Sequence, residues 1–289
     1  MAFQIFTDVT ADLTTDLIER YGIEVLGMEI SVDGVNRHTV GPDAIDAKTL
    51  IAEINAGKKA QTSAVATGEI QEALERYVKL GREIFYLVFS SGLSGTFQSA
   101  NIARDLVLEK YPKAKIIVVD SLAAASGEGY LLEELVKLRD AGNSIEEAQV
   151  ILADIIPRLK SWFMVDDLNF LALGGRISKT AAVFGSMVNI KPVLDVDPTG
   201  HLRAVAKVRG SKKAIGTLIQ NTIEDFDPAF PKIIISYSGD DNLAEEAKSI
   251  FEESLKNVEV ITRQLGPVIC AHTGSGTISI FSIGKTVRV

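Results

Sequence analysis

The sequence is poor in the features that mark disulfide-stabilised, membrane-spanning or nucleic-acid-binding proteins. Its single cysteine, Cys270, cannot form an internal disulfide, which favours a reducing, cytoplasmic setting. No apolar run approaches the ~18 residues that a membrane span needs, and no basic, hydrophobic leader begins the chain, so we expect no stable membrane insertion. The formal net charge of −8 argues against nucleic acid as the main partner, because phosphate backbones attract basic surfaces.

Motifs for nucleotide or metal chemistry are also lacking. There is no Gly-x-x-x-x-Gly-Lys-Ser/Thr loop for nucleotide phosphates and no His/Cys spacing typical of a metal site, so we expect neither a metal nor a cofactor. The segment Gly92–Thr96 is like the Gly-x-Ser-x-Gly turn of serine hydrolases around Ser94, but Thr96 stands where that turn needs its last glycine. The histidine of such a hydrolase would be His272, for which the sequence offers no obvious orienting acid. We therefore expect no catalytic residue, and an autonomous enzyme acting on a small phosphorylated or carboxylated substrate is the alternative function.

Apolar runs and helical patterns alternate through the first half of the chain. Several predicted helices end at a glycine, as helices that close with a left-handed residue do, and Ser144 with Glu147 forms a capping box at the start of another. Strands separated by helices in this way imply right-handed crossovers and a mostly parallel sheet covered by helices on both faces. The predicted strands are residues 3–7, 24–32, 84–89 and 115–120, and the predicted helices are 14–21, 43–55, 68–80, 95–111, 127–141 and 144–160.

The pattern changes after about Trp162, where it becomes typical of an α+β domain with a mainly antiparallel sheet. Strands at 190–196 and 202–208 around a Pro-Thr-Gly turn predict an antiparallel hairpin. Helices are expected at 167–173, 179–187, 211–225 and 242–255, together with a strand at 232–237 and three further strands after residue 255. The sequence thus predicts an α/β domain at 1–161 and an α+β domain at 162–289, with a ligand pocket at their interface.

Three loops rich in glycine and hydroxyl side chains are candidates for binding an anionic group. Ser90–Thr96 follows a predicted strand and precedes a helix, so backbone N–H groups and the positive end of the helix dipole would face an oxyanion. The second loop contains Thr62 and Ser63, and the third is His272–Thr277. Because these loops come from both halves of the chain, a carboxylate or phosphate that they all contact must lie between the halves. The structural alternative is that the hydroxyls only cap the helices that follow them.

Together these segments resemble the DegV family of fatty-acid-binding proteins, and the resemblance extends along essentially the whole chain. It is carried by Ser90–Thr96 and by Phe6–Asp12, Leu173–Ser178, Asn189–Leu194, Lys207–Gly210 and His272–Gly274. Two blocks depart from the family pattern. Val65 and Ala66 stand where the family has a proline and a hydroxyl, and Ser275 replaces the proline of a Gly-Pro-Gly. Because proline restricts the backbone, these differences bear on loop stiffness and on ligand preference.

The resemblance implies a carrier that binds a long-chain fatty acid of the palmitate, stearate or oleate class in a tunnel between the two domains. The carrier presents the carboxylate to a partner, a separate fatty acid kinase, which converts it to an acyl phosphate. The family pattern assigns Arg176 to the encounter with the kinase, and a direct role in ligand binding is the alternative. The ligand-binding residues that the resemblance implies are Thr62, Ser63, Ser94, Gly95, His272 and Thr273.

Overall fold

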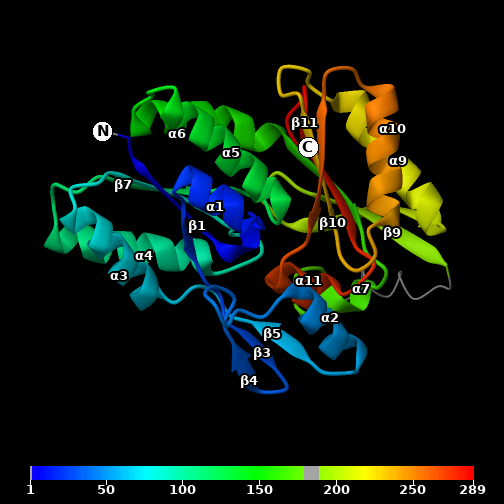
Figure 1. The fold of residues 1–289 in the computed structure, drawn as a ribbon, viewed down its shortest axis with the longest axis horizontal. Coiled ribbons are helices and arrows are strands. Elements are labelled where there is room, and N and C mark those ends of the chain that lie inside the picture. Colours follow the sequence, from blue (N-terminus) through cyan, green and yellow to red (C-terminus); the bar gives the residue numbers. More distant parts are fainter. Residues whose placement is uncertain (1, 179–188) are drawn as a thin grey trace.

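The computed structural model describes residues 2–178 and 189–289, which Figure 1 shows as a ribbon. These residues form a four-stranded parallel sheet, a six-stranded sheet that is mainly antiparallel, and a small three-stranded sheet. The predicted fold class is confirmed. Among the described residues, no helix combines the length and the apolar character needed to cross a membrane. The helix predicted at 179–187 lies outside the described residues.

The parallel sheet consists, in spatial order, of β2 (Glu24–Leu26), β1 (Gln4–Asp8), β6 (Ile84–Val88) and β7 (Ile116–Asp120). Every residue of β6 is buried, because helices cover both faces of the sheet. In Figure 1, one face carries α3 (Thr67–Lys79) and α4 (Thr96–Lys110), and the other carries α1 (Thr15–Tyr21), α5 (Ser126–Asp140) and α6 (Ile145–Ile155). The alternation of strand and helix in the sequence therefore predicts this half of the fold correctly.

The six-stranded sheet has the order β10 (Leu202–Arg209), β9 (Ile190–Val196), β8 (Leu159–Met164), β13 (Ile278–Ile283), β11 (Lys232–Tyr237) and β12 (Glu259–Gln264). Neighbouring strands are antiparallel except β11 and β12. The predicted hairpin is confirmed as β9 and β10. Helices α9 (Ser211–Asp225) and α10 (Asn242–Ser254) pack against this sheet. The predicted domain boundary between residues 161 and 162 falls within β8.

Helix α5 joins the two larger sheets into one hydrophobic core. Its first eleven residues are all buried, and it contacts β8, β11 and β13 as well as the parallel half. Two glycines allow this close approach: an added Cβ would lie 2.8 Å from Phe281 Cδ1 at Gly127 and 2.6 Å from the Ala11 carbonyl oxygen at Gly129. The relative position of the two sheets is therefore set by packing that tolerates little change.

The small sheet has the order β4 (Val35–Arg37), β3 (Ile30–Val32) and β5 (Ala60–Thr62), and α2 (Ala47–Asn55) follows β4 in the chain. The single strand predicted over residues 24–32 is wrong, because its two ends belong to different sheets. Glu24–Leu26 pairs with β1, whereas Ile30–Val32 pairs with β4 and β5. Between them, an added Cβ at Gly27 would lie 2.7 Å from Val40 Cγ2, so a larger residue would require the Val40 side chain to shift. Strand β5, which the sequence pattern did not predict, carries Thr62.

Two further predictions are corrected. The helix predicted from Ser144 to about Lys160 ends at Ile155, followed by a 3-10 turn at Ile156–Arg158, and β8 then begins at Leu159. Pro157 lies in that turn and has no N–H for a continuing helix. After residue 255 there are two strands rather than three, since the apolar run at 268–271 belongs to helix α11 (Pro267–Thr273). Proline at the first helical position is typical of a helix N-terminus.

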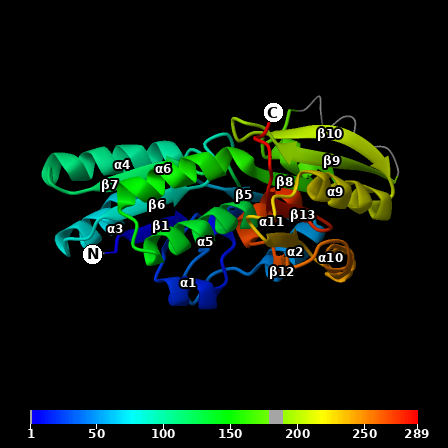
Figure 2. The same cartoon turned by 90° about the horizontal axis from the view of Figure 1, so that it is seen from above.

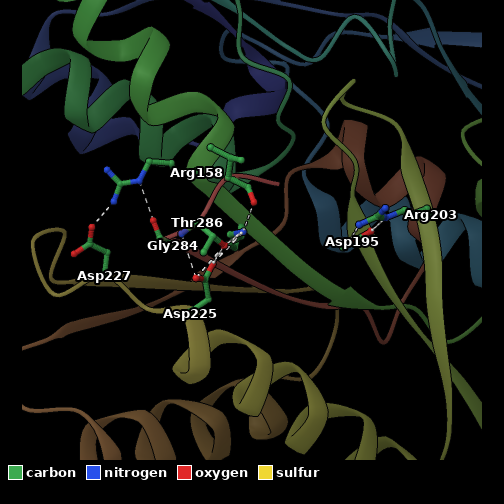
Figure 3. A network of polar contacts seen from close by, with 9 residues as sticks. Arg158, Asp195, Arg203, Asp225, Asp227, Gly284 and Thr286 are labelled. Carbon is green, nitrogen blue, oxygen red and sulfur yellow. Dashed lines mark hydrogen bonds and ion pairs between the residues drawn. The ribbon is translucent and has the colours of Figure 1, made fainter. Parts of the chain in front are cut away.

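Polar contacts hold the C-terminal segment after β13 (Figure 3). The Arg158 Nε donates a hydrogen bond to the Gly284 carbonyl oxygen at 3.0 Å. The backbone N–H of Thr286 donates to Asp225 Oδ1 at 3.2 Å. These bonds join the end of the chain to the start of β8 and to the end of α9.

Candidate functional site

A mainly apolar cavity lies among the six-stranded sheet, α11 and the loops that follow β6 and β7. The space between its lining atoms, including the open mouth, is about 770 Å³. Its apolar lining includes Phe89, Leu93, Phe163, Leu171, Leu202 and Phe281. The two halves of the chain both contribute, because α11 and β13 approach the loops of the parallel sheet from the opposite side (Figure 2).

The structure gathers most of the predicted site residues at this cavity. Side chains of the three candidate loops line it together with the predicted partner residue, and they are Thr62, Ser63, Ser94, His272, Thr273 and Arg176. Gly95 is exposed and is not among the described residues that line the cavity; it is the N-cap residue of α4. Three loops that are far apart in sequence are therefore neighbours in space, as the sequence predicts for a shared ligand.

Thr62 and His272 form the polar contact that joins the two halves at the cavity. Thr62 is the last residue of β5, paired with Ile30, and His272 lies in the last turn of α11. Thr62 Oγ1 and His272 Nε2 are 2.7 Å apart although 210 residues separate them in sequence. Helix α11 packs against β5 and α2, and this packing keeps the side chains of Thr62 and His272 close together.

His272 is kept neutral at ordinary pH. Burial, and to a lesser extent the positive charge of Arg176, lower the pKa of its imidazole from 6.5 to about 4. The Nδ1 atom lies against Gly174, where an added Cβ would come within 2.4 Å of it. A neutral imidazole at this position offers one donor and one acceptor rather than a full charge.

Ser94 has a double role in the loop between β6 and α4. Its Oγ accepts a hydrogen bond from the Thr96 backbone N–H at 3.2 Å and lies 2.9 Å from Thr96 Oγ1. Thr96 Oγ1 in turn accepts from the Val65 backbone N–H at 3.3 Å, which ties this loop to the segment after Thr62. Ser94 thus supports the start of the helix and lines the cavity at the same time, so the structural and the functional interpretations are compatible.

The same loop is fixed to the second half of the chain by the turn between β9 and β10. Ser90 Oγ donates to the Gly200 carbonyl oxygen at 2.8 Å. A Cβ added at Gly92 would lie 2.8 Å from the carbonyl carbon of Gly200, so glycine is required where these two backbones approach.

Arg176 lies between the cavity and a second, outer pocket. Its Nε donates to the Leu93 carbonyl oxygen at 3.0 Å, its Nη1 donates to the Gly174 carbonyl oxygen, and partial burial lowers its pKa. The outer pocket, about 1190 Å³ including its open mouth, shares Thr62, Arg176 and His272 with the cavity. Its other lining residues include Lys58, Lys59 and Leu173. The three shared side chains therefore stand between an apolar interior and a basic outer surface.

The arrangement suits oxyanion recognition better than hydrolysis. His272 faces Thr62 rather than Ser94, and the ring nitrogen that the acid of a catalytic triad would hold lies against Gly174. Asp8 is engaged in the fold, since its carboxylate accepts from the backbone N–H groups of Thr10 and Phe89 at 3.1 Å each. Within residues 2–178 and 189–289, no three His, Cys, Asp or Glu side chains are grouped closely enough to hold a metal ion.

Several lining residues escaped the sequence analysis. Met28 follows β2, Ser161 and Phe163 lie on β8, and Ser279 and Phe281 lie on β13. Alternate residues of these strands face the cavity, so the period of two along each strand was the available signal. The sequence pattern did not assign residues 161–164 to a strand, and the alternation along β13 could not by itself show which of its two faces lines a cavity.

Comparison with known proteins assigns the family. The model described as uncharacterised proteins of the DegV family matches residues 2–285. This chain belongs to the DegV family. It is 52% identical over 288 residues to the DegV domain-containing protein YteA of Lactococcus lactis subsp. lactis, with all of both chains covered.

Solved DegV structures share the fold. DegV, a fatty acid binding protein from Bacillus subtilis, is 28% identical, with a TM-score of 0.83 over 99% of this chain and 100% of that one. The Fatty Acid Kinase (Fak) B3 protein of Streptococcus pneumoniae, solved loaded with linoleic acid, is 20% identical, with a TM-score of 0.86 over 99% of this chain and 100% of that one. At this lower identity the second likeness concerns the fold alone.

Proposed function

We propose that this DegV protein binds a long-chain fatty acid, with the tail in the apolar cavity and the carboxylate at Thr62, Ser94 and His272. The observation that carries the proposal is the cavity itself, which is apolar along most of its wall and polar where the three loops meet. The family membership and the fatty acid binding of the Bacillus subtilis relative support it. The palmitate, stearate or oleate class is the proposed ligand range.

The expected energetics favour a long tail. A saturated chain with about 14 methylenes, each worth ~0.8 kcal/mol on burial, gains on the order of 11 kcal/mol before the losses of association. Two or three neutral hydrogen bonds to the carboxylate add about 1–3 kcal/mol in total. Tail burial thus supplies most of the affinity, and the hydroxyl and imidazole groups orient the carboxylate.

We further propose that the protein is a cytoplasmic carrier for a separate fatty acid kinase rather than an enzyme. The carboxylate would lie behind the wall that the cavity shares with the outer pocket, so the kinase would approach from the outer side. Lys59 and Arg176 give that side positive charge, whereas Lys58 is paired with Glu53, and positive charge suits transfer of a phosphoryl group. Arg176 is the residue that we assign to the kinase encounter.

Organic extraction of the purified protein followed by mass spectrometry tests ligand binding directly. We expect a fatty acid of about 16–18 carbons to be recovered, because burial of a tail of that length supplies most of the expected affinity. A preparation without lipid that also fails to bind added palmitic, stearic and oleic acids would overturn the proposal. Recovery of a short phosphorylated or carboxylated compound, with turnover in the absence of a partner, would support the alternative enzyme.

Arg176→Ala tests the carrier role. If Arg176 serves the kinase, fatty acid affinity should stay within a few-fold of the parent while kinase-dependent phosphorylation of the bound acid falls sharply. Arg20→Ala, at an exposed arginine of α1, is the matched control and should change neither quantity. A large loss of affinity in a folded Arg176→Ala protein would instead assign Arg176 to the ligand.

A further inference from the structure

Two serines interrupt the apolar wall of the cavity at a distance from its polar end. Ser161 on β8 and Ser279 on β13 both line the cavity, and both are buried. Their cross-strand partners are Phe281 for Ser161 and Phe163 for Ser279. The four residues therefore form one patch of the sheet in which hydroxyls and aromatic rings alternate.

The Ser161 hydroxyl is the unusual member of this patch. Its residue is 4% exposed, and its Oγ has no hydrogen-bond partner among the residues that the structure describes. A buried hydroxyl without a partner is unfavourable, and alanine would fill the same position without that penalty. A partner supplied by the ligand would account for a serine here.

The place of Ser161 along the cavity separates it from the carboxylate end. Thr277 immediately precedes β13, and its Oγ1 donates to the carbonyl oxygen of Thr273 at 3.4 Å, so the start of β13 lies beside the polar end of the cavity. Ser279 is two residues farther along, and Ser161 lies opposite residue 281, four residues farther. At a strand rise of ~3.4 Å per residue, these hydroxyls face the cavity roughly 7–14 Å from Thr277. They would meet the middle of a fatty acid tail rather than its carboxylate.

We propose that the cavity is built to take long-chain fatty acids that carry a hydroxyl or keto oxygen on the chain, with Ser161 as the residue that recognises that oxygen. The inference rests on the proposed fatty acid binding and narrows its ligand class. A hydroxyl or keto oxygen at the level of Ser161 completes the hydrogen bonding of its Oγ, whereas a saturated tail leaves it unpaired. Ser279, one diagonal position away on the neighbouring strand, adds a second hydroxyl to the same patch.

The test compares stearic acid with a series of monohydroxystearic acids that differ in the position of the hydroxyl, each bound to delipidated protein by calorimetry. The parent protein should prefer one position of the hydroxyl over the others. Ser161→Ala should reduce the affinity for that isomer, relative to stearic acid, by roughly 2- to 13-fold, as expected for one net hydrogen bond. Ser282→Ala is the matched control, because it removes a buried serine from the opposite face of β13 and should leave the ratio unchanged.

The outcomes separate this inference from the function on which it rests. If stearic acid binds but no hydroxyl position is preferred, or if the preference persists in Ser161→Ala, the role of Ser161 is wrong and fatty acid binding stands. If no acid of either kind binds the parent protein, both proposals fail. If Ser161→Ala does not fold, the absence of any preferred position in the parent protein would still overturn the inference.

Discussion

At one end of the cavity, Thr62, His272 and Arg176 bring polar atoms together from three separate segments of the chain, whereas most of the remaining wall is apolar. The polar end depends on individual contacts, such as the 2.7 Å approach of Thr62 to His272 and the close fit of Gly174 to the same imidazole. The binding free energy contributed by the apolar wall depends on the apolar area that a ligand buries there, and many side chains contribute to that area. The comparison teaches that, under the proposed function, the orientation and the affinity of the fatty acid would be controlled in different parts of one cavity.

The largest expected effect concerns the apolar wall. Shortening a saturated ligand from about 18 to about 10 carbons removes about 8 methylenes. Each methylene contributes at most ~0.8 kcal/mol to binding, so each one removed should lower the affinity by up to roughly fourfold. Competition binding across the series measures the slope. Thr62→Ala should shift the whole series without changing its slope, because the head and the tail contribute separately. An affinity that does not depend on chain length would contradict the claim that the apolar wall supplies most of the binding free energy.

The pH dependence of stability is the next largest effect and concerns only the polar end. Between pH ~6.5 and ~4 the unfolded chain binds a proton at His272 that the folded protein does not, since the folded pKa is about 4. This contribution to stability is complete above pH ~6.5 and is lost as pH falls toward 4, by on the order of 3 kcal/mol. Urea unfolding of the parent and of His272→Gln across this range should give curves that diverge. Parallel curves would contradict the burial of a neutral imidazole, and the exposed His201→Gln is the control.

Gly174→Ala should disturb the polar end while leaving the apolar wall intact. Its Cβ would lie 2.4 Å from His272 Nδ1, so the imidazole cannot keep its present position and its 2.7 Å contact with Thr62 is disturbed. We expect a loss of fatty acid affinity of roughly tenfold, about 1.4 kcal/mol. Gly216→Ala is the control, because nothing lies within 4 Å of the added Cβ there. If the effect acts through His272, combining Gly174→Ala with His272→Ala should weaken binding no further than His272→Ala alone.

Deleting single hydroxyls at the polar end should have the smallest effects. Thr62→Ala and Ser94→Ala each remove about one neutral hydrogen bond, which corresponds to about 0.5–1.5 kcal/mol or roughly 2- to 13-fold in affinity. Isothermal calorimetry with stearic acid measures this loss, and Thr217→Ala, at a half-buried threonine of α9 outside the cavity, should show none. Wild-type affinity in both cavity variants would mean that the carboxylate does not lie at the three loops.

Much of the fold could be predicted because local signals agree with the tertiary structure. The buried strand β6, the capping box at Ser144 and the hairpin of β9 and β10 all follow from patterns within a few residues. The hydroxyl-rich loops could also be chosen as candidates for one shared site, and the structure places them around one cavity. What alternation alone could not tell is which sheet a short strand joins.

The sequence by itself determined the parallel α/β half, the mainly antiparallel second half, and the residue types available at the polar end, because hydrophobic period and loop composition are local properties. Only the tertiary structure decided that residues 24–32 divide between two sheets, that residues 268–271 form part of a helix, and that Thr62 meets His272 across 210 residues. It also decided that Ser161 faces the cavity. The physical reason is that partner choice between distant segments is set by the packing of the whole core, which an apolar run of four to nine residues does not encode.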